Sequence, residues 1–349
     1  MSTDDWRAPL SDWLGAKLRA PVEVREIVRL SGGYSAETLR VETLVAGRAE
    51  RYVLRREVPE PSVYPVQAPG LDVEIEIQWR AMSGLARTSQ VPLAPLIGYE
   101  RDPAAIGAPF FVMGFVEGQV PAVAPPYASA GFFAEATPEQ RRQLVDDGLS
   151  VLAQIHAVDW HAAGFEWLAA PGVEPGALAQ LALWERYGER ELAGREHPLY
   201  ARGLAWLHDH PPAPARLAFS WGDARPGNMI WSDFRCVCVT DFENASIAEP
   251  ELDLGWWLMF DRWSHESFGV ARLPGEPTRD EQREIYLRHA GRTAIDTRWY
   301  EIFAAVRYCA IVVRVMNRAV ARGEMPADQN IWLENPASTC LAQLLDEID

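Results

Sequence analysis

The sequence contains almost no lysine: Lys17 is the only one, and arginine supplies the rest of the 33 basic residues. A phosphate-binding lysine elsewhere in the chain is therefore excluded, and arginine must take any such role. Cysteine is also scarce, and four thiols are too few for a disulfide scaffold in a chain of 349 residues. We expect buried, reduced thiols at Cys236, Cys238, Cys309 and Cys340.

Targeting segments and long hydrophobic runs are missing as well. Residues 1–5 have neither the basic nor the apolar region of a signal peptide, and arginines interrupt the longest apolar stretch, 304–320. The net charge of −16 disfavours binding to nucleic acid and to anionic membranes, and is compatible with a cationic small molecule. We therefore expect a cytoplasmic protein without nucleic-acid or membrane partners. The sequence does not indicate an oligomeric state.

The composition is that of a globular protein, with 48% hydrophobic residues in a chain longer than a typical single domain. An amphipathic helix is predicted near Trp6 to Leu14, and a second over 72–86. Alternating or apolar runs separated by turn residues predict five strands, at 22–30, 36–45, 50–57, 93–99 and 109–116.

Residues after Thr137 are mostly helical by pattern. Thr137, Pro138 and Gln140 form the signature of a capped helix start, and a β-rich insert is predicted over 218–241. The sequence therefore predicts an α+β bilobal protein. A small antiparallel-sheet N-lobe with one helix spans residues 1–116, and a mostly helical C-lobe spans residues 117–349.

The residues that indicate chemistry lie between 221 and 243. Asp223, four intervening residues, Asn228, a predicted hairpin and then Asp241 is the spacing that a phosphoryl-transfer site needs. One carboxylate faces the attacking hydroxyl, while an amide oxygen and a second carboxylate hold Mg²⁺. Arg225 stands where a cation would neutralise charge on the transferring phosphoryl group, or would simply pair with an acid at the surface.

Some neighbouring residues have two interpretations that the sequence leaves open. Glu243 is either a further metal ligand or a solvated or hydrogen-bonded carboxylate. The loop 120–136, with Tyr127 and two phenylalanines, either lines the substrate cleft or is a plain surface loop. Asp253 precedes an apolar segment and is expected to be structural, at a helix N-terminus.

Several further segments stand in the order expected of one family: Ser31-Gly32-Gly33-Tyr34-Ser35, Tyr52-Val53-Leu54-Arg55, Glu76, the segment 111–118 and the segment 249–257. With the 223–241 motif, these residues resemble the aminoglycoside phosphotransferase family of small-molecule kinases, within the protein-kinase-like superfamily. The resemblance covers nearly the whole chain. It is closest to the branch related to the kinase domains fused to some acyl-CoA dehydrogenases.

The resemblance implies ATP and Mg²⁺ as cofactors and a small-molecule hydroxyl as the phosphoryl acceptor. It implies that Asp223 is the catalytic base, that Asn228 and Asp241 hold Mg²⁺, and that Asp253 supports the catalytic loop. The nucleotide would contact the covering loop, the charged pair on strand and helix, and the hinge backbone: Ser31, Gly32, Gly33, Tyr34, Ser35, Arg55, Glu76, Met113 and Phe115.

Three positions depart from the family pattern. Trp221 stands where the family commonly has histidine, Arg55 replaces the usual lysine, and the covering loop has few glycines. Arginine keeps the positive charge but has a larger, forked head group. A catalytically silent nucleotide- or ligand-binding module is therefore the alternative function. Transfer of a nucleotidyl group is a third possibility that no residue specifically supports.

Overall fold

The computed structural model describes residues 3–30, 36–60, 62–67, 70–71, 73–123 and 125–348. Its first part is a five-stranded antiparallel sheet with strand order β1-β2-β3-β5-β4. The strands are β1 (Val22–Arg29), β2 (Glu37–Val45), β3 (Arg48–Arg56), β4 (Leu96–Glu100) and β5 (Phe110–Gly114). All five predicted strands are present, with ends shifted by a few residues.

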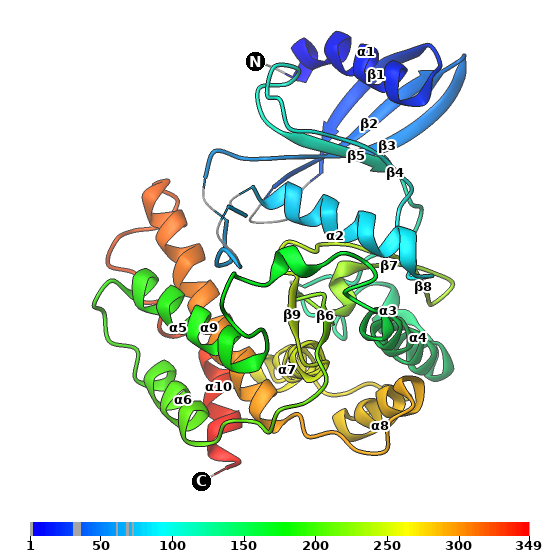
Figure 1. Cartoon of the computed structure of the whole chain (residues 1–349). Coiled ribbons are helices and arrows are strands. Elements are labelled where there is room, and N and C mark those ends of the chain that lie inside the picture. Colours follow the sequence, from blue (N-terminus) through cyan, green and yellow to red (C-terminus); the bar gives the residue numbers. More distant parts are fainter. Residues whose placement is uncertain are drawn as a thin grey trace.

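Two helices flank this sheet. Helix α1 (Arg7–Leu18) packs against β1, and α2 (Glu74–Thr88) contacts β4 and β5 on the side that faces the helical part of the molecule (Figure 1). The hairpin between β2 and β3 turns at Ala46 and Gly47, both of which have positive φ, as a tight two-residue turn requires. The register of the central strand β3 places Arg55 opposite Thr38 on β2 and Phe111 on β5.

The second part is mostly helical (Figure 1). Its α-helices are α3 (Phe132–Glu135), α4 (Pro138–Ala157), α5 (Ala177–Leu192), α6 (Pro198–Asp209), α7 (Glu251–His265), α8 (Arg279–Ala290), α9 (Arg298–Ala321) and α10 (Pro336–Asp346). Helix α4 starts at the predicted capping box. The backbone N–H of Gln140 donates to Thr137 Oγ1, and the N–H of Thr137 donates to Gln140 Oε1.

Two small antiparallel pairs lie among these helices. Strand β6 (Ala218–Ser220) pairs with β9 (Ser246–Ala248), and β7 (Met229–Ser232) pairs with β8 (Arg235–Val239). The loops between these strands carry the 223–241 motif. Within the described residues, no helix is long and apolar enough to cross a membrane. The predicted α+β fold, a small antiparallel sheet followed by a helical part, is confirmed.

Candidate active site

The carboxylate of Asp223 lies at the centre of the candidate site, in the loop after β6, and the residue is only 3% exposed. Its Oδ1 accepts hydrogen bonds from Trp256 Nε1 at 2.7 Å and from Arg225 Nε at 3.0 Å. Its Oδ2 accepts one from the hydroxyl of Tyr64 at 3.2 Å. Three donors on two oxygens fix the plane of the carboxylate.

The charge state of Asp223 follows from these contacts. Burial by itself would raise the pKa of Asp223, because it penalises the charged form. The charge of Arg225 and the hydrogen bonds from Trp256 and Arg225 outweigh burial, so the pKa of Asp223 lies below its ordinary value. Asp223 is therefore ionised at neutral pH and has the protonation state that a proton acceptor needs.

The loop reaches this geometry because residue 222 is glycine. Gly222 has a φ of 91°, and a Cβ there would lie 2.1 Å from the carbonyl oxygen of Asn244. Asn244 also donates from Nδ2 to the carbonyl of Gly222 at 3.1 Å. The two segments approach too closely for any side chain, and this close approach sets the direction in which Asp223 leaves the loop.

Asp253, at the start of α7, supports the loop that carries Asp223. Its Oδ1 accepts from Ser220 Oγ at 2.9 Å and from the backbone N–H of Gly222 at 2.8 Å. Its Oδ2 accepts from the backbone N–H of Trp221 at 2.6 Å and contacts His156 Nε2 at 3.0 Å. Asp253 is completely buried, so the geometry agrees with the structural role expected for it.

Trp221, which replaces the family histidine, connects the two halves of the motif. Its indole Nε1 donates to the carbonyl oxygens of Thr240 at 2.8 Å and Asp241 at 3.2 Å. The side chain is fully buried. Tryptophan thus supplies one N–H donor that ties the Asp223 loop to the Asp241 loop.

Asn228 and Asp241 are brought beside Asp223 by the β7–β8 hairpin. Asn228 ends the short 3₁₀ turn η3 (Pro226–Asn228), and its carbonyl accepts from both the backbone N–H and the hydroxyl of Thr240. Its Nδ2 donates to the backbone carbonyl of Asp223 at 3.0 Å. That bond orients the amide and leaves its oxygen, a ligand type that Mg²⁺ prefers, for another partner.

Asp241 has strained backbone geometry, with a φ of 64°. Burial raises the pKa of Asp241, the charge of Arg55 lowers it, and the charge of Asp223 raises it again, with a net increase. The negative charge of Asp223 therefore acts on the Asp241 carboxylate. A bound cation would relieve this repulsion, so the donor set fits a divalent metal ion.

Arg55 reaches this centre from β3. Its Nη2 lies 3.3 Å from Asp241 Oδ1, and its Nη1 donates to Thr38 Oγ1 at 3.1 Å. Burial would lower the pKa of Arg55, but the charges of Asp241, Glu243 and Glu74 raise it overall. Arg55 therefore carries a stable positive charge beside the predicted metal ligands.

The predicted pairing of Arg55 with Glu76 is not found among the described residues, and the structure corrects it. Glu76 instead contacts Tyr99 at 3.3 Å and Arg80 at 3.8 Å. Of these two glutamates on α2, Glu74 is the one whose charge acts on Arg55, and it is 4% exposed. Two residues along an α-helix rotate a side chain by about 200°, so Glu74 and Glu76 lie on opposite faces of α2.

Glu243 is a buried carboxyl group rather than a solvated one, with 6% exposure. Burial, the charge of Glu74 and a hydrogen bond to that residue raise the pKa of Glu243 well above its ordinary value. The protonated form of Glu243 is therefore favoured more than it is in an exposed glutamate. Burial excludes a solvated carboxylate, but Oε2 of Glu243 has no hydrogen-bond partner among the described residues. The metal-ligand and hydrogen-bonded interpretations therefore both stay open.

The remaining predicted nucleotide contacts are only partly placed. Residues 31–35 lie outside the described residues. Met113 is in β5, paired with Val53 on β3, and the backbone N–H of Phe115 donates to the carbonyl of Arg51 at 3.1 Å. That N–H is already used, so Phe115 would have to contact an adenine through its carbonyl group.

A pocket lies beside the candidate site, and Arg225 is one of the residues that line it. Its walls come from the 120–136 loop, the catalytic loop and α7, including Val123, Tyr127, Trp257, Phe260 and Trp263. The guanidinium of Arg225 lies over the ring of Phe260, 5.3 Å from its centroid. The 120–136 loop therefore does line a cavity beside the site, and this cavity is largely apolar.

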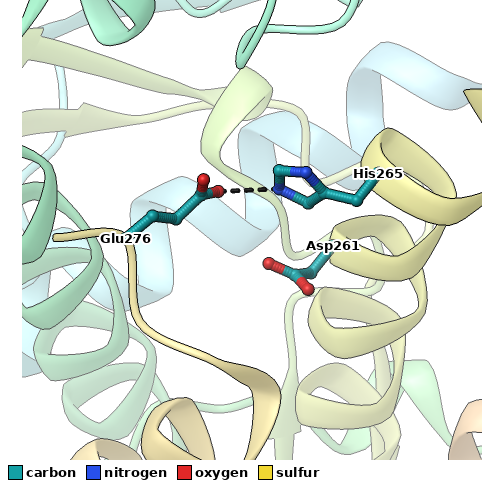
Figure 2. Close-up of side chains that lie close together, drawn as sticks. All are labelled: Asp261, His265 and Glu276. Atoms are coloured by element: carbon teal, nitrogen blue, oxygen red, sulfur yellow. Dashed lines mark hydrogen bonds and ion pairs between the residues drawn. The ribbon is translucent and has the colours of Figure 1, made fainter. Parts of the chain in front are cut away.

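A second acidic cluster, which the sequence does not indicate, adjoins this pocket, and Asp261 belongs to both. Asp261, His265 and Glu276 have ligand atoms within 4.8 Å of one another (Figure 2). Asp261 already accepts from Arg272 at 2.6 and 3.1 Å and from Gln282 at 2.8 Å, and His265 Nε2 lies 2.7 Å from Glu276. A metal ion would have to displace a guanidinium, so we interpret the cluster as an ion-pair network that supports the pocket wall.

Three residues at the candidate site are not indicated by the sequence. Trp256 and Tyr64 donate to the Asp223 carboxylate, and Glu74 acts by its charge on Arg55. Tyr64 lies in a proline-rich stretch that carries no motif. The burial stripe of α2 includes Glu74 and Gln78, so a polar residue on the apolar face was the available clue for Glu74.

The sequence matches a family model described as a phosphotransferase enzyme family over residues 26–301. Among curated proteins, it is 24% identical over 323 residues to acyl-CoA dehydrogenase family member 10 of Mus musculus, covering 89% of this chain and 28% of that protein. It is 25% identical over 303 residues to acyl-CoA dehydrogenase family member 11 of Homo sapiens, covering 79% and 36%. The chain spans about a third of the length of these relatives.

Solved structures share the fold. A crystal structure from Ralstonia eutropha, named as an aminoglycoside phosphotransferase, aligns with a TM-score of 0.71 and 22% identity over 97% of this chain and 98% of that one. An aminoglycoside phosphotransferase mutant in ternary complex with ADP and hygromycin B aligns with a TM-score of 0.57 and 12% identity, over 97% and 98%. At these identities the alignments establish the architecture.

Proposed function

Because this chain belongs to the phosphotransferase enzyme family, we propose that it transfers the γ-phosphoryl group of ATP to a hydroxyl group of a small molecule. The observation that carries the proposal is a set of contacts that link the three loops: Asn228 donates to the backbone carbonyl of Asp223, Trp221 donates to that of Asp241, and Arg55 pairs with the Asp241 carboxylate. We further propose that residues 1–116 cover the nucleotide and residues 117–349 provide the catalytic loop and the acceptor site.

Asn228 and Asp241 are the residues that would hold Mg²⁺, because they offer amide and carboxylate oxygens at the same edge of the hairpin. When bound, Mg²⁺ and ATP supply the activated phosphoryl group. Arg55 would contact the nucleotide phosphates with its guanidinium, which can bind two oxygens at once. The covering loop 31–35 and the backbone of Met113 and Phe115 are proposed to contact the rest of the nucleotide.

Asp223 is proposed as the catalytic base. It is ionised, it is oriented by Trp256 and Arg225 on Oδ1, and it therefore presents Oδ2 to the acceptor. Its lowered pKa is compatible with this role, since phosphoryl transfer depends more on positioning than on a strong base. Arg225 is held against Asp223, so we propose that it acts by fixing the carboxylate and adding positive charge beside the acceptor.

The test is Asp223→Asn in an assay of ADP release with Mg²⁺, ATP and a panel of hydroxylated metabolites. Loss of the proton acceptor is expected to lower kcat by at least about 100-fold, while ATP binding measured by calorimetry stays nearly unchanged. Asp233→Asn, in the exposed β7–β8 turn, is the matched control and is expected to keep wild-type activity. Wild-type turnover by Asp223→Asn would refute the base assignment.

One observation favours the second candidate, a catalytically silent nucleotide-binding module. Arg55 pairs with Asp241 at 3.3 Å, so the cation that replaces the family lysine contacts a predicted metal ligand. This candidate predicts a rise in Tm with Mg²⁺ and ATP but no ADP release with any alcohol. The kinase proposal predicts the same rise in Tm and, in addition, ADP release.

A further inference from the structure

Tyr64 lies where the acceptor hydroxyl is expected to meet the catalytic carboxylate. The residue belongs to the connection between β3 and α2, which crosses from the sheet to the helical part (Figure 1). Its hydroxyl is 3.2 Å from Asp223 Oδ2, and it is the only side chain in the described part of the chain that is hydrogen-bonded to this oxygen. The proposed function does not use this contact.

The connection is fixed to the helical part on both sides of Tyr64. The hydroxyl of Tyr187 donates to the carbonyl of Val63 at 2.5 Å. Gln67 donates to Asn244 Oδ1 at 3.0 Å and accepts from Gln180 Nε2 at 2.9 Å. Val63 and Gln67 are buried, with 5% and 7% exposure. These contacts hold the segment around Tyr64 in place against the helical part.

A third fixation point comes from Glu60, four residues before Tyr64. Its carboxylate forms ion pairs with Arg318 on α9 and with Arg322, the residue that follows this helix. The ring of Tyr64 packs edge-on against Trp184, with centroids 6.3 Å apart. The ring contact with Trp184 and the hydrogen bond to Asp223 together hold the phenol with its hydroxyl directed at the carboxylate.

The hydroxyl of Tyr64 stays protonated and acts as a donor. Burial and the nearby charges of Asp223, Glu243 and Asp241 raise the pKa of Tyr64 well above its ordinary value. A phenolate there would face three acidic groups, so a proton cannot pass from Tyr64 to Asp223 in the resting site.

We propose that Tyr64 is a positioning residue for phosphoryl transfer, which fixes Asp223 Oδ2 from the acceptor side. This rests on the proposed function. Trp256 and Arg225 occupy Oδ1, and Tyr64 takes one of the two lone pairs of Oδ2. The acceptor hydroxyl must use the remaining lone pair, so it binds beside the phenol and in one direction.

The transfer step itself leaves Tyr64 unchanged. The acceptor oxygen forms a bond to the γ-phosphorus, the bond from that phosphorus to the β,γ-bridging oxygen breaks, and ADP leaves. The acceptor proton moves to Asp223 Oδ2. The hydrogen bond from Tyr64 keeps that oxygen aligned while the proton arrives, which is an orientation effect rather than a chemical one.

The experiment is Tyr64→Phe, which keeps the ring against Trp184 and removes only the donor. Turnover of ATP in the presence of Mg²⁺ is measured as ADP release. The acceptor is water, or any alcohol that increases the rate. We expect kcat to fall by about 10-fold or more, the usual effect of losing one hydrogen bond to a charged group, with KM for ATP within about twofold of wild type. Tyr200→Phe removes a buried phenol hydroxyl that donates to the carbonyl of Trp184 at 3.3 Å, and as the control it should leave kcat unchanged.

The coupling to Asp223 separates positioning from a structural effect. If Tyr64 acts through Asp223, Tyr64→Phe should not lower the residual rate further in an Asp223→Asn background. A kcat within about twofold of wild type for Tyr64→Phe, or an equal loss in both backgrounds, overturns the assignment. A wild-type rate for Asp223→Asn defeats the proposed function itself, whereas loss in Asp223→Asn with full activity in Tyr64→Phe defeats only the role of Tyr64.

A crystal structure tests the role of Tyr64 even if no turnover can be measured. A crystal structure of the wild-type protein with Mg²⁺ and ADP should retain the hydrogen bond between Tyr64 and Asp223. A separation beyond hydrogen-bond distance in that complex overturns the proposal.

Discussion

Replacing Asp253 by asparagine tests how much the fold depends on the support beneath the catalytic loop. The carboxylate accepts four hydrogen bonds, two on each oxygen, and each oxygen receives one backbone N–H: Gly222 on Oδ1 and Trp221 on Oδ2. An amide has one acceptor oxygen. Either orientation of an asparagine therefore turns its NH₂ group toward one of these backbone donors.

The expected magnitude follows from that geometry. Ser220 can rotate its hydroxyl, and His156 can change tautomer, to accept from the new NH₂ group, but a backbone N–H cannot adapt. One buried N–H without an acceptor costs about 1–3 kcal/mol, and the surviving bonds weaken because the acceptor is no longer charged. Asp253→Asn should therefore lower the free energy of unfolding by about 2–4 kcal/mol.

The assay is urea denaturation, combined with ADP release for the folded fraction. Asp159→Asn is the matched control, because Asp159 also accepts two backbone N–H groups, at 3.0 and 3.1 Å, but through a single oxygen on an exposed side chain. Asparagine keeps that oxygen, so the control should change the free energy of unfolding by less than about 0.5 kcal/mol. A loss below about 1 kcal/mol for Asp253→Asn, or equal losses in both variants, would refute the reasoning.

Two further substitutions test the surroundings of the site. Gly222→Ala should lower the free energy of unfolding by more than about 3 kcal/mol and abolish turnover. As the control, Gly323→Ala should lower it by only about 1 kcal/mol, because Gly323 has a φ of 72° but open space around it. Similar losses for the two variants in urea denaturation would contradict the steric argument. Hydrogen bonds from Arg322 and Arg318 lower the pKa of Glu60 from 4.5 to about 2. A lowered folded-state pKa gives stability that is present above the unfolded value and lost as pH falls. Glu60→Gln should therefore be less stable by less than about 1 kcal/mol near neutral pH, since the pair is partly exposed. The difference should shrink as the pH falls from about 5 through about 2. A difference that does not depend on pH would count against the ion pairs.

Local patterns in the sequence predicted most of the secondary structure. The capping box at Thr137 places the start of α4, and the Ala46-Gly47 turn places the β2–β3 hairpin, because both signals depend on residues only a few positions apart. The same locality explains the error at Glu76. The two glutamates at 74 and 76 are alike in sequence, and only the packing of α2 against the sheet decides which one faces Arg55.

The buried arginine of α9 shows the same limit. Arg307 interrupts the apolar run 304–320, and arginine is seldom fully buried, yet it is 1% exposed. Its guanidinium lies between the rings of Trp184 and Trp256, 4.8 and 4.4 Å from their centroids, and burial lowers the pKa of Arg307 to about 10. Two aromatic faces from distant segments stabilise the cation there.

The sequence by itself determined the order of elements, the α+β class and the spacing of Asp223, Asn228 and Asp241, because these depend on neighbours along the chain. Only the tertiary structure decided the partners of those residues. Tyr64 and Asp223 are 159 positions apart, and Arg55 and Asp241 are 186 apart. Contacts over such separations depend on how the sheet packs on the helical part, and no local periodicity encodes that packing.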